Sequence, residues 1–148
     1  GFVKKEINRL LSYPKRRRHE ETLEDFFSIG EEGDLTPHEK LVKDCMEIIK
    51  RELPNADFNV DKLIGHLNIS RTKCYRAFKE VMDKSPSDVI IGLRLQKASY
   101  LLKNKRLNIS EVCYDCGFND PRYFSRLFKK YYMVNPKAYK EKKPMSES

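Results

Sequence analysis

Long apolar stretches are absent from this chain of 148 residues. No run approaches the ~20 consecutive apolar residues that a helix needs to cross a bilayer. The N-terminus also lacks the apolar segment and the small-residue cleavage site of a secretory signal peptide. We therefore expect neither a membrane-spanning helix nor a signal peptide. Because the chain begins with Gly1 and Phe2 rather than Met, we expect a fragment whose sensory or catalytic part is missing.

Strand signals are scarce as well. The Asn-Gly and Asp-Gly dipeptides of tight hairpins are absent, and so are alternating apolar runs. Helical periodicity, in contrast, recurs along the chain. The sequence therefore predicts an all-α fold.

Motifs typical of enzymes are also missing. No Gly-rich phosphate loop or catalytic triad pattern occurs, so we expect neither catalysis nor a cofactor. Among the four cysteines, Cys113 and Cys116 form a Cys-x-x-Cys pair, but a zinc site needs two further ligands and the three histidines are scattered. The better interpretation is a pair of small buried hydrophobes, and stoichiometric zinc would overturn it. Free cysteines in so charged a chain favour a reduced, cytoplasmic setting.

What the chain does have is positive charge, with a net charge of +8. Such an excess favours a polyanionic partner, either nucleic acid or an anionic membrane surface. Residues 1–35 hold seven Lys or Arg and eight Asp or Glu, so the remainder carries +9. We interpret residues 1–35 as a partly ordered N-terminal arm or linker, 36–143 as the folded domain and 144–148 as a tail.

Two helix starts are clear from the residues alone. Thr36 fits an N-cap, with Pro37 at the first helical position and Glu39 completing a capping box. Ser85 and Pro86 repeat the pattern at the start of a longer helix, which we expect to run over about 86–104. At ~1.5 Å per residue, about eighteen residues span ~27 Å.

The strongest signal is an internal repeat at an offset of 49 to 50 residues. The segment NVDKLIGHLNIS, from residue 59, aligns with NISEVCYDCGFND, from residue 108. The alignment places Cys113 and Cys116 on the apolar Ile64 and Leu67, which favours a core position for both cysteines.

Each copy predicts the same unit. A short helix, capped by Asp61 or Ser110, precedes a tight turn at Asn68 or Gly117, the residue types that best tolerate left-handed backbone. A second helix of about three turns follows. We therefore predict two helix-turn-helix units, over about 59–83 and 109–132.

The second helix of each copy has an apolar face and a basic face. The apolar faces consist of Cys74, Ala77, Phe78 and Val81, and of Phe124, Leu127, Phe128 and Tyr131. Such a basic helix fits the major groove of B-DNA, where Arg can bond guanine and Ser or Thr can reach base edges. The candidates for base reading are Thr72, Tyr75, Arg76, Arg122, Ser125 and Arg126. The candidates for phosphate contact are Arg71, Lys73, Lys79, Lys129 and Lys130.

Over residues 38–143 the sequence resembles the AraC/XylS-type transcription regulators. The most specific part is RLQKASYLLKNKRLNISEVCYDCGFNDPRYFSRLFKKYYMVNPKAYK, residues 94–140. The resemblance implies a homeodomain-like domain of about seven helices, which binds a promoter through two recognition helices in successive major grooves and usually activates transcription. It also adds Pro121 to the base-reading positions. Because Pro121 cannot donate a side-chain hydrogen bond, base reading in the second copy falls mostly on Arg122 and Arg126.

The resemblance further implies double-stranded DNA and RNA polymerase as partners. It implies a sensory domain elsewhere in the chain, dimerisation through that part, and a link to two-component systems as the cytoplasmic output module of a hybrid sensor kinase. Asp83 and Met133 stand where the family commonly has Gly. The alternative is a helical protein-interaction or dimerisation module, which would explain the aromatic residues but not two matching basic faces.

Overall fold

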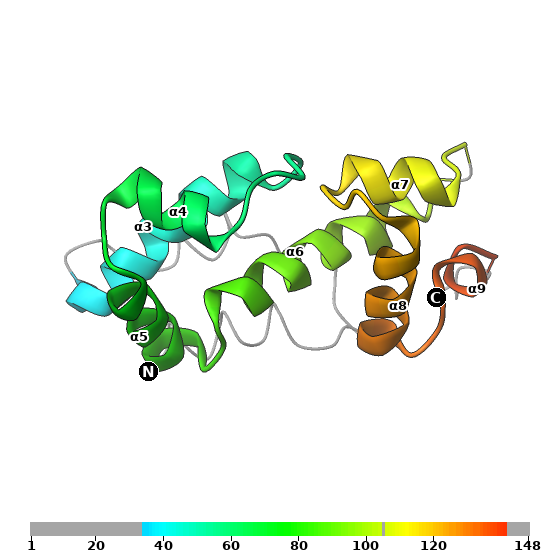
Figure 1. The fold of residues 1–148 in the computed structure, drawn as a ribbon. Coiled ribbons are helices and arrows are strands. Elements are labelled where there is room, and N and C mark those ends of the chain that lie inside the picture. Colours follow the sequence, from blue (N-terminus) through cyan, green and yellow to red (C-terminus); the bar gives the residue numbers. More distant parts are fainter. Residues whose placement is uncertain (1–33, 105, 142–148) are drawn as a thin grey trace.

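A computed structural model describes residues 34–104 and 106–141 of the chain. These residues form α-helices and no strand, as predicted (Figure 1). The seven helices are α3 (Pro37–Glu52), α4 (Val60–Leu67), α5 (Arg71–Met82), α6 (Pro86–Leu101), α7 (Ile109–Asp115), α8 (Pro121–Tyr132) and α9 (Pro136–Glu141). None of these helices combines the length and hydropathy of a bilayer span. The predicted tail and most of the predicted N-terminal arm lie outside the described residues.

Two of the helices start where the sequence predicts. At α3, the Thr36 hydroxyl accepts a hydrogen bond from the Glu39 amide (3.1 Å), and the Glu39 carboxylate accepts one from the Thr36 amide (3.0 Å). At α6, the Ser85 hydroxyl caps the helix and Pro86 occupies the first position. These N-caps are confirmed, because each satisfies an amide that the first turn leaves without an intrahelical partner.

The predicted N-caps of α4 and α7 are wrong. Asp61 and Ser110 lie inside the first turn, and the caps are Asn59 and Asn108, two residues earlier. The side-chain oxygen of each Asn accepts a hydrogen bond from the amide three residues further on. Asn, Asp and Ser are all strong N-caps, so residue type alone could not choose between such close neighbours.

The end of α6 also differs from the prediction. The helix ends at Leu101, three residues before the expected end at Asn104. There the amides of Lys103 and Asn104 donate to the carbonyls of Tyr100 and Leu101, and these tighter turns stop the α-helix. With 16 residues, α6 is about 24 Å long.

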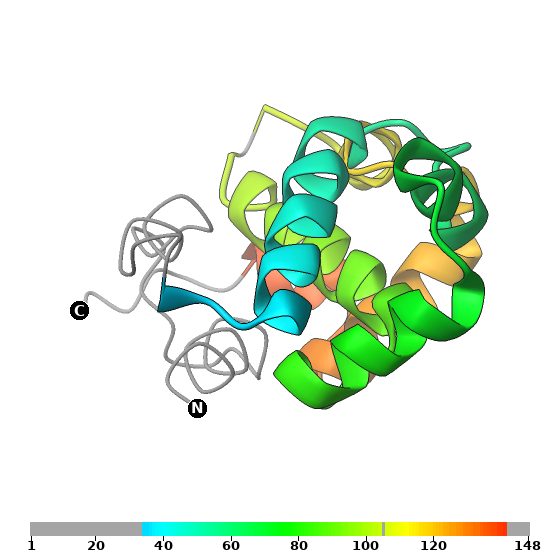
Figure 2. The same cartoon turned by 90° about the vertical axis from the view of Figure 1, so that its left-hand side faces the viewer.

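Two separate hydrophobic cores share α6. Val89 and Leu93 pack with α3, α4 and α5, whereas Leu95 and Ala98 pack with α7, α8 and α9. In Figure 1, the two groups of helices lie at opposite ends of α6, and Figure 2 views the molecule from the end with α3, α4 and α5. We call these groups the first half and the second half. Each half contains one copy of the sequence repeat.

The predicted apolar faces are buried with two exceptions. The buried residues of the α5 face are Cys74, Ala77, Phe78 and Val81. In α8, Phe124 and Phe128 are fully buried, but Leu127 and Tyr131 are only half-buried. These two side chains lie at the edge of the second core, which covers one side of each.

Cys113 and Cys116 are fully buried in the second core, as predicted. Burial raises the pKa of the Cys113 thiol to about 11 and that of the Cys116 thiol to about 12, so both are protonated near neutral pH. The aligned Ile64 and Leu67 are less buried than we predicted, because they lie at the edge of the first core. Across residues 34–104 and 106–141, no group of three or more His, Cys, Asp or Glu side chains could hold a metal ion.

Left-handed backbone follows both helices of each helix-turn-helix unit. Asn68 has a φ of 53° and Gly117 a φ of 91°, as predicted for the two tight turns. Asp83 and Met133, which follow α5 and α8, have φ values of 57° and 67°. Gly, and to a lesser degree Asn and Asp, tolerate this conformation, whereas for Met it costs roughly 1–2 kcal/mol, so the turn at Met133 is strained.

Replacing Met133 with Gly is therefore expected to raise the free energy of unfolding by about 0.5–1 kcal/mol. The Met133 side chain is 80% exposed, so its removal costs little packing, while the left-handed backbone is relieved. Urea and thermal unfolding of both proteins measure the gain. The control is Met133→Ala, which shortens the side chain but keeps Cβ and should bring no gain. An equal gain from Ala would mean that the exposed side chain, and not the backbone, is the source.

Candidate nucleic-acid interface

The predicted DNA-binding residues lie on α5 and α8, at opposite ends of α6 (Figure 1). The Ser70 hydroxyl caps α5 by accepting a hydrogen bond from the Lys73 amide (3.0 Å). The Asp120 carboxylate caps α8 by accepting one from the Arg122 amide (3.0 Å), and Pro121 fills the first helical position. The caps determine where each helix begins, and hence which residues occupy its first turns.

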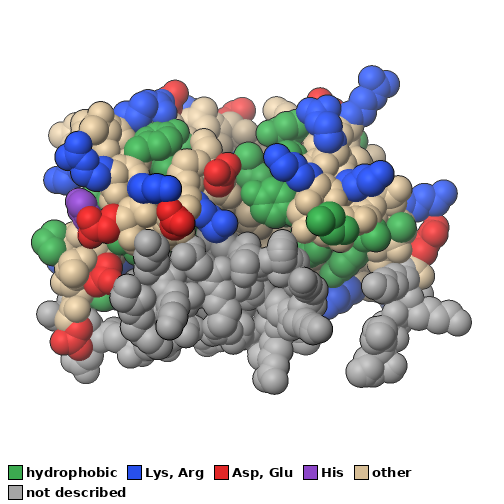
Figure 3. Space-filling view, turned by 90° about the horizontal axis from the view of Figure 1, so that it is seen from below, with side chains coloured by type: hydrophobic (Ala, Val, Ile, Leu, Met, Phe, Trp, Pro, Cys, Tyr) green, Lys and Arg blue, Asp and Glu red, His purple; other side chains and the backbone are tan. Residues whose placement is uncertain are grey.

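Most of the predicted residues reach the surface. The exposed ones are Arg71, Thr72, Lys73, Arg76 and Lys79 on α5 and Arg122, Arg126, Lys129 and Lys130 on α8. Tyr75, Pro121 and Ser125 are half-buried. Figure 3 shows Lys and Arg side chains over both halves of the molecule, with acidic side chains among them. The fold thus presents the predicted residues as two separate basic surfaces, one for each half.

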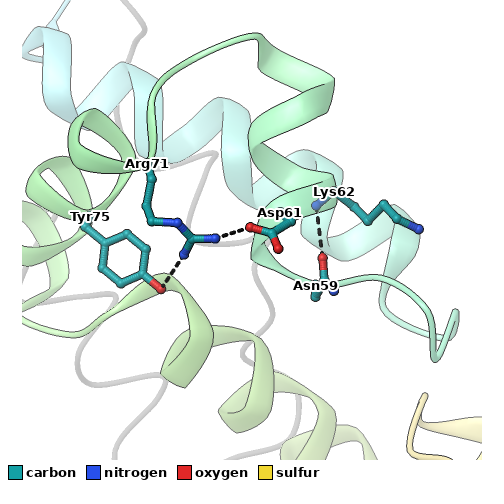
Figure 4. A network of polar contacts seen from close by, with 5 residues as sticks. All are labelled: Asn59, Asp61, Lys62, Arg71 and Tyr75. Carbon is teal, nitrogen blue, oxygen red and sulfur yellow. Dashed lines mark hydrogen bonds and ion pairs between the residues drawn. The ribbon is translucent and has the colours of Figure 1, made fainter.

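Arg71 is already engaged within the first half (Figure 4). Its guanidinium donates to the Asp61 carboxylate through Nη2 and to the Tyr75 hydroxyl through Nη1, the latter at 3.3 Å. The guanidinium carbon lies 5.6 Å from the centroid of the Tyr75 ring. Asn59 caps the turn that carries Asp61, by accepting a hydrogen bond from the Lys62 amide. The network therefore joins the start of α4 to the first turns of α5.

Sequence reasoning missed Asp61 as part of this surface. The i, i+4 spacing of Arg71 and Tyr75 on one helix was a signal, but ten residues and a turn separate Asp61 from Arg71. The side chains of Arg71 and Asp61 are 55% and 71% exposed, so the ion pair is worth only about 0–1 kcal/mol. A phosphate oxygen can therefore replace the Asp61 carboxylate at small cost, and the predicted phosphate contact of Arg71 requires that exchange.

The second half is built differently at the same positions. The residues aligned with Asp61, Arg71 and Tyr75 are Ser110, Pro121 and Ser125, none of which is charged. Instead, the Arg126 guanidinium lies 5.4 Å from the centroid of the Tyr123 ring, whose edge meets Phe118. Tyr123 was not among the predicted residues, and it steadies Arg126 through a cation–π contact.

Lys79 has a carboxylate partner as well. Its ammonium lies 2.8 Å from the Asp83 carboxylate, four residues further on. In the second half, the aligned residues are Lys129 and Met133, so no carboxylate stands at that position. The basic surface of α5 is thus partly neutralised by Asp61 and Asp83, whereas the aligned Ser110 and Met133 of the second half carry no charge.

Replacing Asp61 with Ala is expected to strengthen binding to random duplex DNA by up to about fivefold, the equivalent of an exposed ion pair. The change removes the carboxylate that Arg71 must leave before it contacts a phosphate, so affinity should rise while the slope of log K against log salt, which counts phosphate contacts, stays nearly the same. Fluorescence anisotropy over a series of salt concentrations measures both quantities.

The matched control is Asp57→Ala, which removes the same charge from an exposed position in the segment between α3 and α4. Its effect should be smaller than that of Asp61→Ala. Equal gains from the two substitutions would assign the effect to net charge and contradict the release of Arg71.

Comparisons with known proteins agree with this architecture. A helix-turn-helix domain family matches residues 63–142. Histidine kinase P4 of Formosa agariphila is 32% identical over 104 residues, which cover 70% of this chain and 8% of that protein. The HTH-type transcriptional regulator MtrA of Neisseria gonorrhoeae is 34% identical over 88 residues, which cover 60% of this chain and 29% of that protein. The chain thus spans less than a third of either relative.

Solved structures show the same fold. The C-terminal domain of the two-component response regulator yesN from Fusobacterium nucleatum superposes with a TM-score of 0.65 and 30% identity, over 68% of this chain and 98% of that domain. The DNA-binding domain of the global transcriptional factor AdpA, in complex with a target DNA, gives a TM-score of 0.61 and 25% identity, over 66% and 86% of the two chains. The chain belongs to the helix-turn-helix domain family, as an AraC/XylS-type domain that binds specific DNA sequences.

Proposed function

We propose that α5 and α8 are the two recognition helices and that they enter successive major grooves on one side of a promoter. The observation that supports this proposal is the pair of exposed basic surfaces at opposite ends of α6. A strut of about 24 Å, with a recognition helix at each end, suits a groove spacing of ~34 Å.

The residues of each surface have two kinds of role. Those proposed to face base edges are Thr72, Tyr75, Arg76, Pro121, Arg122, Ser125 and Arg126. Those proposed to contact phosphates are Arg71, Lys73, Lys79, Lys129 and Lys130. Arg76 and Arg126 occupy the same position in the two copies, and the fork of each guanidinium matches the two acceptors of guanine in the major groove. The domain acts by binding, and no catalytic step is part of the proposal.

Selection of duplexes from a random pool with the 148-residue chain tests the proposal. The expected product is a site with two short conserved blocks about 10–11 base pairs apart, bound in a salt-dependent way. A single conserved block would contradict the use of both helices. If no duplex is enriched and random DNA is not bound even at low salt, the alternative of a helical protein-interaction or dimerisation module is favoured.

For the whole protein, we propose an activating output module of a two-component signalling system. The similarity to a histidine kinase and to the end of a response regulator supports this role. The sensory domain would lie elsewhere in the protein, mediate dimerisation and place this domain on the cytoplasmic side, where RNA polymerase is a partner. A reporter gene behind the selected site should be induced by the full-length protein, and repression would contradict activation.

A further inference from the structure

Arg94 is a buried charged residue at the border between the two cores. It lies on α6 and is 8% exposed. Its guanidinium donates to three backbone carbonyls of the segment between α3 and α4: Nε to Leu53 (3.1 Å), and Nη2 to Asn55 (2.8 Å) and Phe58 (3.3 Å). The planar fork of Arg can satisfy several acceptors at once, and the C-terminal carbonyls of a helix attract a cation. Arg94 therefore ties α6 to the end of α3.

Gly117, in the turn between α7 and α8, packs against the Arg94 side chain and the Leu53 carbonyl. A methyl group on its Cα would overlap the Leu53 carbonyl oxygen and lie 2.8 Å from Nε of Arg94. The turn between α7 and α8 thus packs directly against the hydrogen bond from Arg94 of α6 to the Leu53 carbonyl of the first half. Figure 1 shows the segment after α3 and the turn after α7 meeting beside α6. One turn further along α6, Lys97 donates to the carbonyl of Asp115 (3.4 Å).

We propose that this junction, formed by Arg94, Leu53 and Gly117, fixes the orientation of the first half relative to the second. The two halves have separate cores that share α6, so apolar packing sets the angle between them only as far as α6 keeps its shape. A single helix can bend, whereas a buried guanidinium with three acceptors and a turn packed against it has one geometry. Arg94 is thus a positioning residue, which acts on DNA binding through the placement of α5 and α8.

The inference rests on the proposed function in one respect, namely that both halves bind one duplex. Two linked binding units gain affinity only when their geometry allows simultaneous contact, and the gain reaches ~10²–10⁴-fold. A junction that fixes the angle selects one spacing of the two half-sites. Loss of the junction should therefore weaken the complete site, spare the half-sites and relax the choice of spacing.

Residual dipolar couplings of backbone amides in the weakly aligned 148-residue chain test the junction without DNA. In the wild type, one alignment tensor should fit α3–α5 and α7–α9 together. In Arg94→Met, the two halves should need different tensors. Arg51→Met is the matched control, since Arg51 is exposed at the end of α3 and loses the same charge. One shared tensor in Arg94→Met, in the wild-type orientation, would overturn the proposal.

Two further variants distinguish loss of the junction from simple misfolding of Arg94→Met. Arg94→Lys keeps the charge, but its single ammonium cannot reproduce the fork. Gly117→Ala disturbs the junction from the other half. At least one of them should keep dispersed amide signals and show two tensors, and a shared tensor in every folded variant would overturn the proposal.

The second measurement uses the duplex selected by the wild-type chain. One base pair inserted between its two blocks turns them by ~35° and should weaken wild-type binding about tenfold or more. For Arg94→Met, the same insertion should change affinity less than about threefold, with unchanged affinity for each block alone. Equal sensitivity to the insertion in both proteins would contradict the role of Arg94. If the wild type selects no duplex, the proposed function fails, whereas the dipolar couplings still decide the role of the junction.

Discussion

Replacing both Arg76 and Arg126 with Ala is expected to weaken binding to the selected duplex by about 2–6 kcal/mol, because each contributes about 1–3 kcal/mol if it bonds guanine through two acceptors. The two residues stand on different helices at opposite ends of α6 and share no partner in the structure, so their effects should add. The loss should fall on the specific site more than on random duplex DNA, since base contacts carry the sequence preference.

The experiment compares the ratio of specific to random affinity at one salt concentration for the wild type, both single variants and the double variant. Arg51→Ala with Arg106→Ala is the matched control, because both arginines are exposed, lie outside α5 and α8, and remove the same total charge. The control should lower both affinities alike and leave the ratio unchanged. An unchanged ratio in Arg76→Ala and Arg126→Ala would refute base reading by these residues.

Phe128→Ala is expected to lower the free energy of unfolding by about 3–5 kcal/mol. The ring is fully buried, stacks on Tyr132 at 4.5 Å between centroids and meets the edge of Tyr139 at 5.3 Å. It also contacts Phe124 within α8. Removing it leaves a cavity at the centre of the second core and takes away the surface on which α9 packs. Thermal unfolding measures the loss, and an unchanged melting temperature would contradict the burial of this residue.

The same substitution tests whether the two cores are independent. Amide hydrogen exchange in Phe128→Ala should accelerate in α7, α8 and α9 and much less in α3, α4 and α5. Phe78→Ala, at the aligned position in the first core, should give the opposite pattern. An equal loss of protection in both halves from either variant would show that the two halves unfold as one unit.

The differences between the halves give the two surfaces different electrostatic properties. The first half holds Arg71 and Lys79 against carboxylates, whereas the second half carries uncharged residues at the aligned acidic positions. Phosphate binding by Arg71 and Lys79 must therefore break an exposed ion pair at each residue, a cost of about 0–1 kcal/mol apiece that the aligned positions of the second half do not carry. The difference is visible in the sequence, where Asp61 and Asp83 align with Ser110 and Met133, but aligning the two copies draws attention to the residues that they share.

The sequence by itself determined the features that depend on short-range interactions. The capping box at Thr36, the cap at Ser85, the buried face of α5 and the left-handed turns at Asn68 and Gly117 each depend on a few consecutive residues. The repeat added the division into two units, because the same local pattern occurred twice. At the starts of α4 and α7, several neighbouring residues are of types that cap helices equally well, and the predicted N-cap was two residues too late.

Only the tertiary structure decided the contacts between segments distant in the sequence. Arg94 finds its carbonyl partners 36 to 41 residues away, and no periodicity relates such positions. Arg71 meets Asp61 only because the turn between α4 and α5 folds one helix start against the other. The half-burial of Leu127 and Tyr131 likewise depends on how far the second core extends. These contacts determine the charge that each surface presents and the placement of α5 relative to α8, because both depend on distances across the fold.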